Sequence, residues 1–189
     1  MRKCFLLLPV ALMMMGVIAC SEKKGCSIEG HTSFNQYQKA YLIDLDGNRL
    51  DSVNMEDGKF GFQMADNVVS PYALMVHLQE NHDPYDWIEM PVFIENGMVT
   101  MEIGDVIHIS GTSLNDGLQE FFDSLQHSKD ATKVKKDITI EEVEATFSEF
   151  YKQQILMNKD NALGRYIYRE YGSNMKEADR KHVEAQMAN

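Results

Sequence analysis

Covalent chemistry in this chain depends first on its cysteines, Cys4, Cys20 and Cys26. Cys20 follows a positively charged start and an apolar run at residues 5–18. A charged start, an apolar core and small residues before a cut are typical of an export signal, and a retained span would need about 20 apolar residues. We therefore predict that residues 1–19 are a signal peptide, cleaved before Cys20. An ordinary secretory signal with an incidental cysteine is the alternative.

The residues that lead to the second cysteine, Val17-Ile18-Ala19-Cys20, resemble the lipobox of bacterial lipoproteins. In that family the thiol receives a diacylglyceryl group, and a thiolate forms such a thioether far more readily than a hydroxyl could. The resemblance implies that Cys20 is the lipidation site and that its lipid is the contact with the membrane. Two or more acyl chains make such an anchor durable. The expected location is the bacterial cell envelope, at the outer membrane and facing the periplasm or the surface.

Cys26 is left alone once Cys4 leaves with the signal and Cys20 carries lipid. An internal disulfide is then impossible, although exported proteins reside where disulfides persist. We predict that residues 20–26 form a lipidated tether and that Cys26 is an exposed residue of it. A redox or intermolecular role for Cys26 is the alternative.

A calcium loop is suggested superficially by Asp44-Leu45-Asp46-Gly47-Asn48. An EF-hand loop that began at Asp44 would need glycine at Arg49 and glutamate at Met55. The sequence therefore favours a turn between two strands, where Asp-Gly is ordinary chemistry.

Metal or catalytic chemistry could also be sought at His77 and His82 with Asp83, since imidazole and carboxylate bind zinc. Their spacing matches no known metal site, and we interpret them as strand and loop residues. The chain lacks a Gly-x-Ser-x-Gly elbow, a phosphate loop and a dinucleotide fingerprint. We predict no catalytic residue, metal site or cofactor.

Two further side-chain groups could belong to a site. Asp51 breaks an apolar face in phase with Val53 and Met55, and we expect it to bond to backbone or to Ser52 at the entry of a strand. The aromatic residues could line a ligand groove, but aromatic side chains in a sheet are usually core, and we expect core positions for Tyr72, Tyr85 and Trp87.

The charge of the chain restricts its partners. The 189 residues include 29 Asp and Glu against 18 Lys and Arg, for a formal net charge of -11. Such a surface repels polyanions, which disfavours nucleic acid and anionic lipid headgroups as partners.

Three turn signals organise the first half of the chain. Asn96-Gly97 suits a type I′ turn and predicts a hairpin that opposes Ile94 to Val99 and Val92 to Met101. Asp57-Gly58 predicts another, with Met55 opposite Phe60, Val53 opposite Phe62 and Glu56 beside Lys59. A third turn is expected at residues 46–48.

These turns separate short apolar alternations before Gly111, with further strands expected at residues 27–33, 72–79 and 106–110 and a polar loop at 81–85. About eight strands result. A sheet with one apolar face must cover it, so we predict an antiparallel β-sandwich or open barrel at residues 27–112.

The period becomes helical after Gly111, and residues 113–189 are predicted to be a helical segment, which makes the chain α+β. We expect a short helix from Ser113 as N-cap, ended by a charged break at residues 129–137. Thr139 and Glu142 predict a capping box for a second helix that ends near residue 158. A third helix at residues 160–171 would stop at Gly172, and a weaker fourth would span 175–187.

Six short segments resemble, in order and spacing, the domain of unknown function 4369; they lie at residues 27–30, 40–44, 50–53, 57–62, 93–97 and 109–115. In that family the domain commonly follows a lipoprotein signal and precedes a thioredoxin-like domain with a Cys-x-x-Cys pair. Such a pair works because its second thiol resolves the mixed disulfide. This chain lacks the pair, so none of its residues inherits a redox role.

Two classes of function follow from the sequence. The first is a lipid-anchored envelope protein that binds a ligand or another protein without catalysis. The alternative is an accessory or truncated member of a thiol-disulfide or peroxiredoxin-like lipoprotein system, with a thioredoxin-like partner. A hydrolase is a third and more distant hypothesis.

Overall fold

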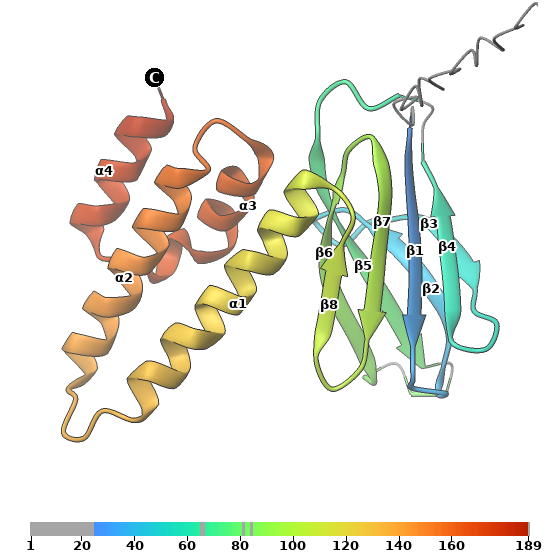
Figure 1. The fold of residues 1–189 in the computed structure, drawn as a ribbon, viewed down its shortest axis with the longest axis horizontal. Coiled ribbons are helices and arrows are strands. Elements are labelled where there is room, and N and C mark those ends of the chain that lie inside the picture. The colour runs from blue at the N-terminus through green and yellow to red at the C-terminus, as the bar shows by residue number, and fades with distance from the viewer. Residues whose placement is uncertain (1–24, 65–66, 81, 84, 189) are drawn as a thin grey trace, which may run out of the picture.

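The computed structural model describes residues 25–64, 67–80, 82–83 and 85–188. They form eight strands in two four-stranded sheets that pack as a sandwich, followed by four α-helices, so the α+β prediction is confirmed (Figure 1). The predicted signal peptide and Cys20 lie outside the described residues.

The strands and helices follow one another without interleaving. The strands are Cys26–Thr32 (β1), Tyr37–Ile43 (β2), Arg49–Asn54 (β3), Lys59–Gln63 (β4), Tyr72–Glu80 (β5), Trp87–Ile94 (β6), Gly97–Ile103 (β7) and Ile107–Ser110 (β8). The helices are Ser113–Lys133 (α1), Ile140–Met157 (α2), Ala162–Tyr171 (α3) and Glu177–Met187 (α4), with a short 3-10 turn, Gly172–Asn174, before α4.

The sheets have the strand orders β4-β1-β7-β8 and β3-β2-β5-β6. All neighbours are antiparallel except β1 and β7, which run parallel. The edges are therefore β6 and β8 on one side of the sandwich and β3 and β4 on the other. Apolar side chains that alternate along the strands fill the space between the sheets.

The hairpin predicted at Asn96-Gly97 is wrong, because the chain crosses there from one sheet to the other. Strand β6 pairs with β5, whereas β7 pairs with β1 and β8. Val92, Ile94, Val99 and Met101 are nevertheless all fully buried. Their alternation is satisfied equally by facing one another across the core as by pairing within one sheet, so the pattern could not separate the two arrangements.

The turn predicted at Asp57-Gly58 is confirmed, with φ of 49° and 73°. Glu56 and Lys59 exchange both backbone hydrogen bonds, at 3.1 and 2.9 Å. The predicted pairing stops there, since β3 and β4 belong to different sheets. The turn at residues 46–48 is also confirmed: Gly47 has φ of 86°, and Asp44 N–H donates to the Asn48 carbonyl at 2.9 Å.

The first helix is longer than predicted. It starts at Ser113, with Thr112 in the N-cap position, and it continues through the charged residues of the expected break as far as Lys133. Charged residues do not by themselves end a helix. Lys, Asp and Ala in this stretch are compatible with a solvent-exposed helix. For α2 the capping box of Thr139 and Glu142 is confirmed, and the helix ends at Met157.

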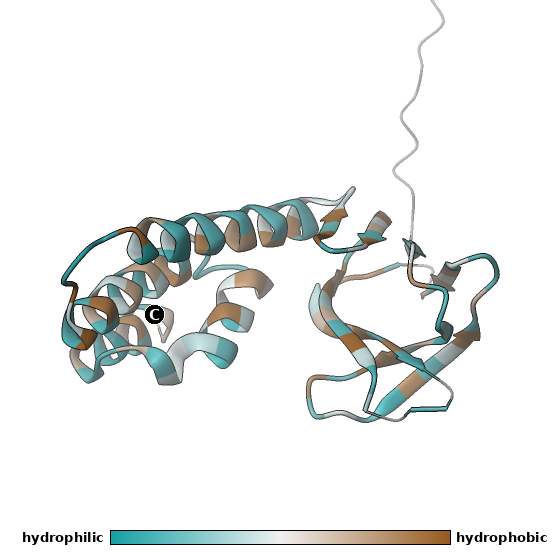
Figure 2. Cartoon of the chain, turned by 90° about the horizontal axis from the view of Figure 1, so that it is seen from below, coloured by the Kyte–Doolittle hydropathy of each residue, from teal (hydrophilic) through white to brown (hydrophobic). Residues whose placement is uncertain are grey.

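The helices gather on one side of the sandwich, and α1 reaches across from the sandwich to the others (Figure 2). Their shared core includes an aromatic group in which the ring centroids of Phe121 and Tyr171 lie 5.3 Å apart and those of Tyr151 and Tyr171 5.0 Å apart. Among the helices of the described residues, none is both long enough and apolar enough to cross a bilayer.

Candidate functional site

Helix α1 begins beside the end of β8 and passes the side of the sandwich where β6 and β8 are edge strands (Figure 1). Residues four apart share one face of a helix, and Asn115 and Gln119 face the sheets in this way. The Asn115 side chain accepts from Phe93 N–H and donates to the Phe93 carbonyl, both at 2.9 Å. Gln119 Oε1 accepts from Ile109 N–H at 2.8 Å. The helix thus supplies both edges with hydrogen bonds that a neighbouring strand would otherwise make.

Further along α1 the contact opens into a groove of about 650 Å³ between the helix and the two strand edges. Its apolar lining comes from Pro91 on β6, Ile107 on β8, and Phe122 and Leu125 on α1. Val106 also lines the groove and is 80% exposed. An apolar hollow of this size is what small-molecule and peptide sites provide.

The backbone of both edges points into this groove. Glu80 N–H donates to the Asp86 carbonyl at 3.0 Å. In an antiparallel pair this bond means that the backbone N–H and carbonyl groups of the even-numbered residues of β6 face β5, and those of the odd-numbered residues face outward. Phe93, bonded to Asn115, fits this alternation, and Glu89 and Pro91 follow it. On β8 the same alternation turns Ile107 outward. Within the part of the chain that the structure describes, nothing hydrogen-bonds to the outward backbone groups of Glu89 and Ile107.

The charged residues of the groove are mostly acidic. Glu89, Asp105 and Asp123 line it together with one basic residue, Lys129. Glu89 Oε1 lies 2.7 Å from His77 Nδ1, and Asp123 Oδ1 accepts from Gln119 Nε2 at 2.9 Å. The groove therefore favours a partner that carries positive charge.

A row of aromatic and basic side chains crosses the outer face of the β3-β2-β5-β6 sheet next to the groove. The Arg49 guanidinium lies 4.1 Å from the centre of the Tyr41 ring, and the Tyr41 and His77 rings are 5.9 Å apart. The His77 ring also stacks on the Trp87 ring, with 5.8 Å between the ring centroids. His77 Nδ1 donates to Glu89, since a carboxylate only accepts, while its buried Nε2 has no partner among the described residues. The row fixes the side chain of Glu89 at the groove.

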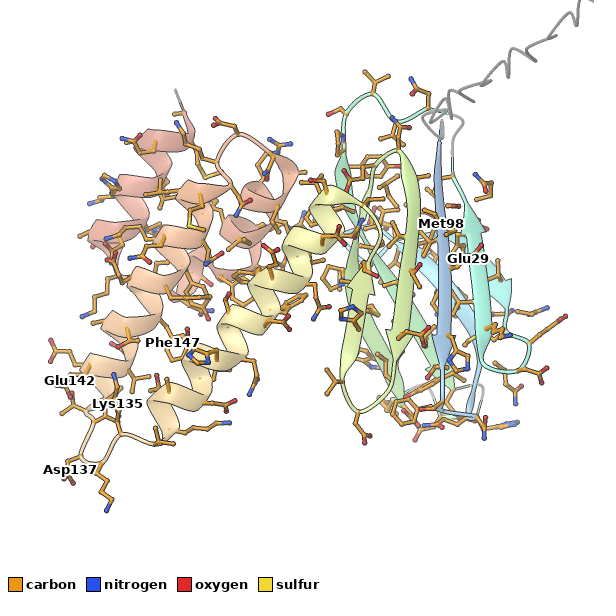
Figure 3. All side chains as sticks on the ribbon, viewed as in Figure 1. Glu29, Met98, Lys135, Asp137, Glu142 and Phe147 are labelled. Carbon is orange, nitrogen blue, oxygen red and sulfur yellow. The ribbon has the colours of Figure 1, made fainter. Side chains whose placement is uncertain are left out.

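Other hollows are less suited to binding, and two of them illustrate why. One of about 590 Å³ is at the tip of the helices, lined by Lys135, Asp137 and Glu142 (Figure 3). Glu142 is engaged there in the capping box, and the hydrogen bonds from Thr139 hold the pKa of its carboxyl below the usual range. Another, of about 360 Å³, lies on the outer face of the other sheet near Glu29. Neither combines an apolar lining with free strand edges.

Cys26 is not an exposed tether residue, and that prediction is wrong. It is the first residue of β1, it is fully buried, and its carbonyl accepts from Met64 N–H at 2.8 Å. Burial raises the pKa of its thiol, which disfavours the reactive thiolate. The strand begins sooner than the polar residues before Cys26 indicate, because pairing with β4 and β7 extends to its first residue.

The structure separates the histidines considered as metal ligands. His77 lies in β5, whereas His82 lies in the following loop, where its backbone N–H donates to Glu80 Oε2 at 2.7 Å, and Asp83 N–H bonds to the same oxygen. Over residues 25–64, 67–80, 82–83 and 85–188, no group of three His, Cys, Asp or Glu side chains is placed to hold a metal ion.

The remaining candidates are exposed rather than core. Tyr72, Tyr85 and Trp87 are 45%, 89% and 49% exposed, so the expected core positions are wrong. Asp51 accepts from Ser52 N–H at 2.7 Å, as predicted, but it is exposed because β3 is an edge strand with little buried surface. Side-chain type alone does not tell the outer face of a sheet from the inner one.

Asn115 and Gln119 were not predicted as site residues, and they are almost fully buried on the apolar stripe of α1 beside Leu118 and Phe122. Their positions were a usable signal. Two amides four residues apart within an apolar stripe indicate buried backbone groups that need partners.

Residues 26–118 match the model of a family described as a domain of unknown function, DUF4369. The chain contains a DUF4369 domain. The match covers all eight strands and the first six residues of α1, so the contact of Asn115 with Phe93 lies within the DUF4369 domain, and Gln119 follows directly after it. No curated protein matches the chain.

Proposed function

We propose that this protein is a lipid-anchored component of the cell envelope that binds a partner, without catalysis, in the groove between its DUF4369 domain and α1. The lipid on Cys20 attaches the chain to the membrane. The groove carries the proposal, because its apolar lining lies directly beside backbone groups that have no partner among the described residues.

The polar groups of the groove support binding rather than proton transfer. Glu89 is held by His77, and Asp123 accepts from Gln119, so two of the three carboxylates already have fixed partners. Fixed acceptors at the rim of an apolar hollow orient a bound partner and select its charge.

The alternative, a role in a thiol-disulfide system, draws no support from Cys26. Its thiol is buried and its pKa is raised, whereas reactive cysteines have lowered pKa values and some exposure. Membership in such a system would require thiols other than that of Cys26.

The proposal is tested in the native host by placing the photo-reactive residue benzoyl-phenylalanine at Val106, at the exposed rim of the groove. Met157, which is 73% exposed at the end of α2, is the matched control position. We expect one discrete cross-linked species from position 106 and none from position 157. Equal patterns from both positions, or none from position 106, would contradict groove binding.

The same strains test the anchor. We expect a labelled lipid precursor to enter the wild-type chain, and the Cys20→Ala variant to lose both this label and its membrane association. Unchanged labelling of the variant would remove Cys20 as the anchor.

A further inference from the structure

We propose that the groove binds an extended, basic segment of another protein, which adds a strand to the β6 edge of the DUF4369 domain. This inference rests on the proposed function, since it specifies the partner of the same groove.

The backbone of β6 presents the necessary groups. The backbone groups of its odd-numbered residues face away from β5. Glu89 therefore offers an N–H and a carbonyl to the groove, and Pro91 offers a carbonyl. Asn115 already makes the two hydrogen bonds of a neighbouring strand at Phe93. An added strand would continue from that point toward Trp87, and Asn115 would mark its end.

The β6 edge is favoured over the β8 edge by length and by free donors. Strand β8 has four residues, and its outward Ile109 N–H is taken by Gln119. Strand β6 has eight residues, and only Phe93 among its outward residues is bonded by α1. Strand addition to an exposed edge is a common mode of peptide recognition, in which main-chain hydrogen bonds give affinity and pockets for alternate side chains give specificity.

The side chains around the groove indicate what the segment carries. On an added strand, alternate side chains point to opposite faces. One set would meet the apolar lining at Ile107 and Phe122, and the other would lie beside Glu89, which is oriented by His77. With three carboxylates and one ammonium group at the groove, basic residues in that second set are favoured and acidic ones are repelled.

A helix or a compact apolar molecule fits these observations less well. Either could fill the hollow, but neither would satisfy the N–H and carbonyl of Glu89. A helix bonds its own backbone internally, and an apolar molecule has no groups that hydrogen-bond to the strand. Only an extended segment uses both the lining and the edge.

The test uses the full chain reconstituted in phosphatidylcholine nanodiscs and fluorescein-labelled octapeptides of alternating valine and lysine. Fluorescence anisotropy at low salt is expected to show saturable binding of this peptide. A valine-glutamate peptide should bind at least about tenfold more weakly. Equal binding of the two peptides, or no binding of the valine-lysine peptide, overturns the proposal.

Two N-methylated versions of the valine-lysine peptide examine the backbone. One carries its methyl groups on the amides of the valines and the other on the amides of the lysines, so that each blocks one edge of the strand. Because the apolar lining fixes which side chains face inward, we expect one version to lose about tenfold in affinity and the other less than about threefold. Equal affinities for the two versions would exclude strand addition.

Variants of β6 separate charge from backbone. Glu89→Gln removes the charge and should weaken lysine-peptide binding about threefold, whereas Glu89→Pro also removes the N–H and should weaken it further. Proline is tolerated on edge strands, and Pro91 already occupies the next outward position. Glu120→Gln, on the exposed face of α1 outside the groove, is the matched control and should change nothing. If Glu120→Gln weakens binding as much as Glu89→Gln, the contribution of Glu89 is not local and the proposal fails.

Failure of this inference is distinct from failure of the proposed function. A cross-link from position 106 without binding of the valine-lysine peptide would leave the groove as a binding site and overturn strand addition. Loss of both would overturn both.

Discussion

The two open sides of the sandwich are closed in different ways. At β6 and β8, side chains of α1 bond to the strand edges, Asn115 to Phe93 and Gln119 to Ile109. At β3 and β4, the chain itself closes the side through the turn at Asp57 and Gly58.

The turn side brings the two strand edges together at one point. Glu56 and Lys59 exchange two backbone bonds, and Thr32 N–H donates to the Gly58 carbonyl at 2.8 Å. The hollow there has a volume of about 370 Å³, and its lining includes the charged residues Glu56, Asp57 and Lys59. Closure by a covalent turn brings two edges together at one point, whereas closure by a helix seals one end and leaves a groove at the other. We place the binding site beside α1 because the groove there combines an apolar lining with outward backbone groups of β6.

The largest expected effect is on the helix side. Asn115→Leu keeps the number and branching of the side-chain heavy atoms but leaves Phe93 N–H and its carbonyl buried without partners. At about 1 to 3 kcal/mol for each unsatisfied group, the free energy of unfolding should fall by about 3 kcal/mol in chemical denaturation. A loss below about 1 kcal/mol would mean that water replaces Asn115 and that the edge is not sealed by α1.

The second effect is on the turn side. Gly58 has φ of +73°, and a Cβ there would lie 2.2 Å from the Thr32 carbonyl oxygen. Gly58→Ala should cost about 2 kcal/mol or more in unfolding free energy, because strain and a backbone clash combine.

Gly47→Ala is the matched control for that turn. Its φ is +86°, but nothing lies within 4 Å of the added Cβ, so only the strain of about 1 kcal/mol is expected. Equal losses for the two variants would show that the approach of Gly58 to β1 contributes nothing to the closure.

The smallest effect on stability is expected from a substitution between α2 and α4, away from both open sides of the sandwich. Asp179 on α4 accepts from Lys152 Nζ at 2.8 Å and from Ser148 Oγ at 2.6 Å on α2. Asp179→Asn should lower the unfolding free energy by about 1 kcal/mol at pH 7 and leave peptide binding in the groove unchanged. Altered peptide binding would show that the groove depends on the packing of the whole helical segment.

This last effect depends on pH. The hydrogen bonds from Lys152 and then from Ser148 hold the pKa of the Asp179 carboxyl below its ordinary value of 3.8. A lowered pKa stabilises the folded state above the ordinary value, and this contribution is lost as the pH falls through the lowered one. The wild type and the Asn variant should therefore converge in stability below pH 3.8, as followed by denaturation at a series of pH values.

Local features of the fold could be read from the sequence, because they depend on neighbouring residues. The turns at residues 46–48 and 57–58 and the capping box of Thr139 and Glu142 have the geometry that their residue types favour. The approximate strand positions followed from apolar alternation and turn residues. Sheet membership did not: the residues around Asn96-Gly97 alternate as predicted, yet the two strands lie in different sheets.

The candidate site was the least predictable part. Trp87 and Cys26 were assigned by residue type and by sequence neighbours, and the structure reverses both, with Trp87 exposed and Cys26 buried. The groove joins residues from β6, β8 and α1, and no short-range pattern shows which strands become edges or which helix lies beside them.

The sequence by itself determined the apolar alternation, the turns, the helix cap and the acidic charge of this chain, since each depends on residue types within a few positions. Only the tertiary structure decided which strands pair, which edges stay open and where α1 seals them. Those outcomes depend on burying apolar surface and pairing backbone groups between segments far apart in the chain, and several pairings bury the same alternating side chains equally well.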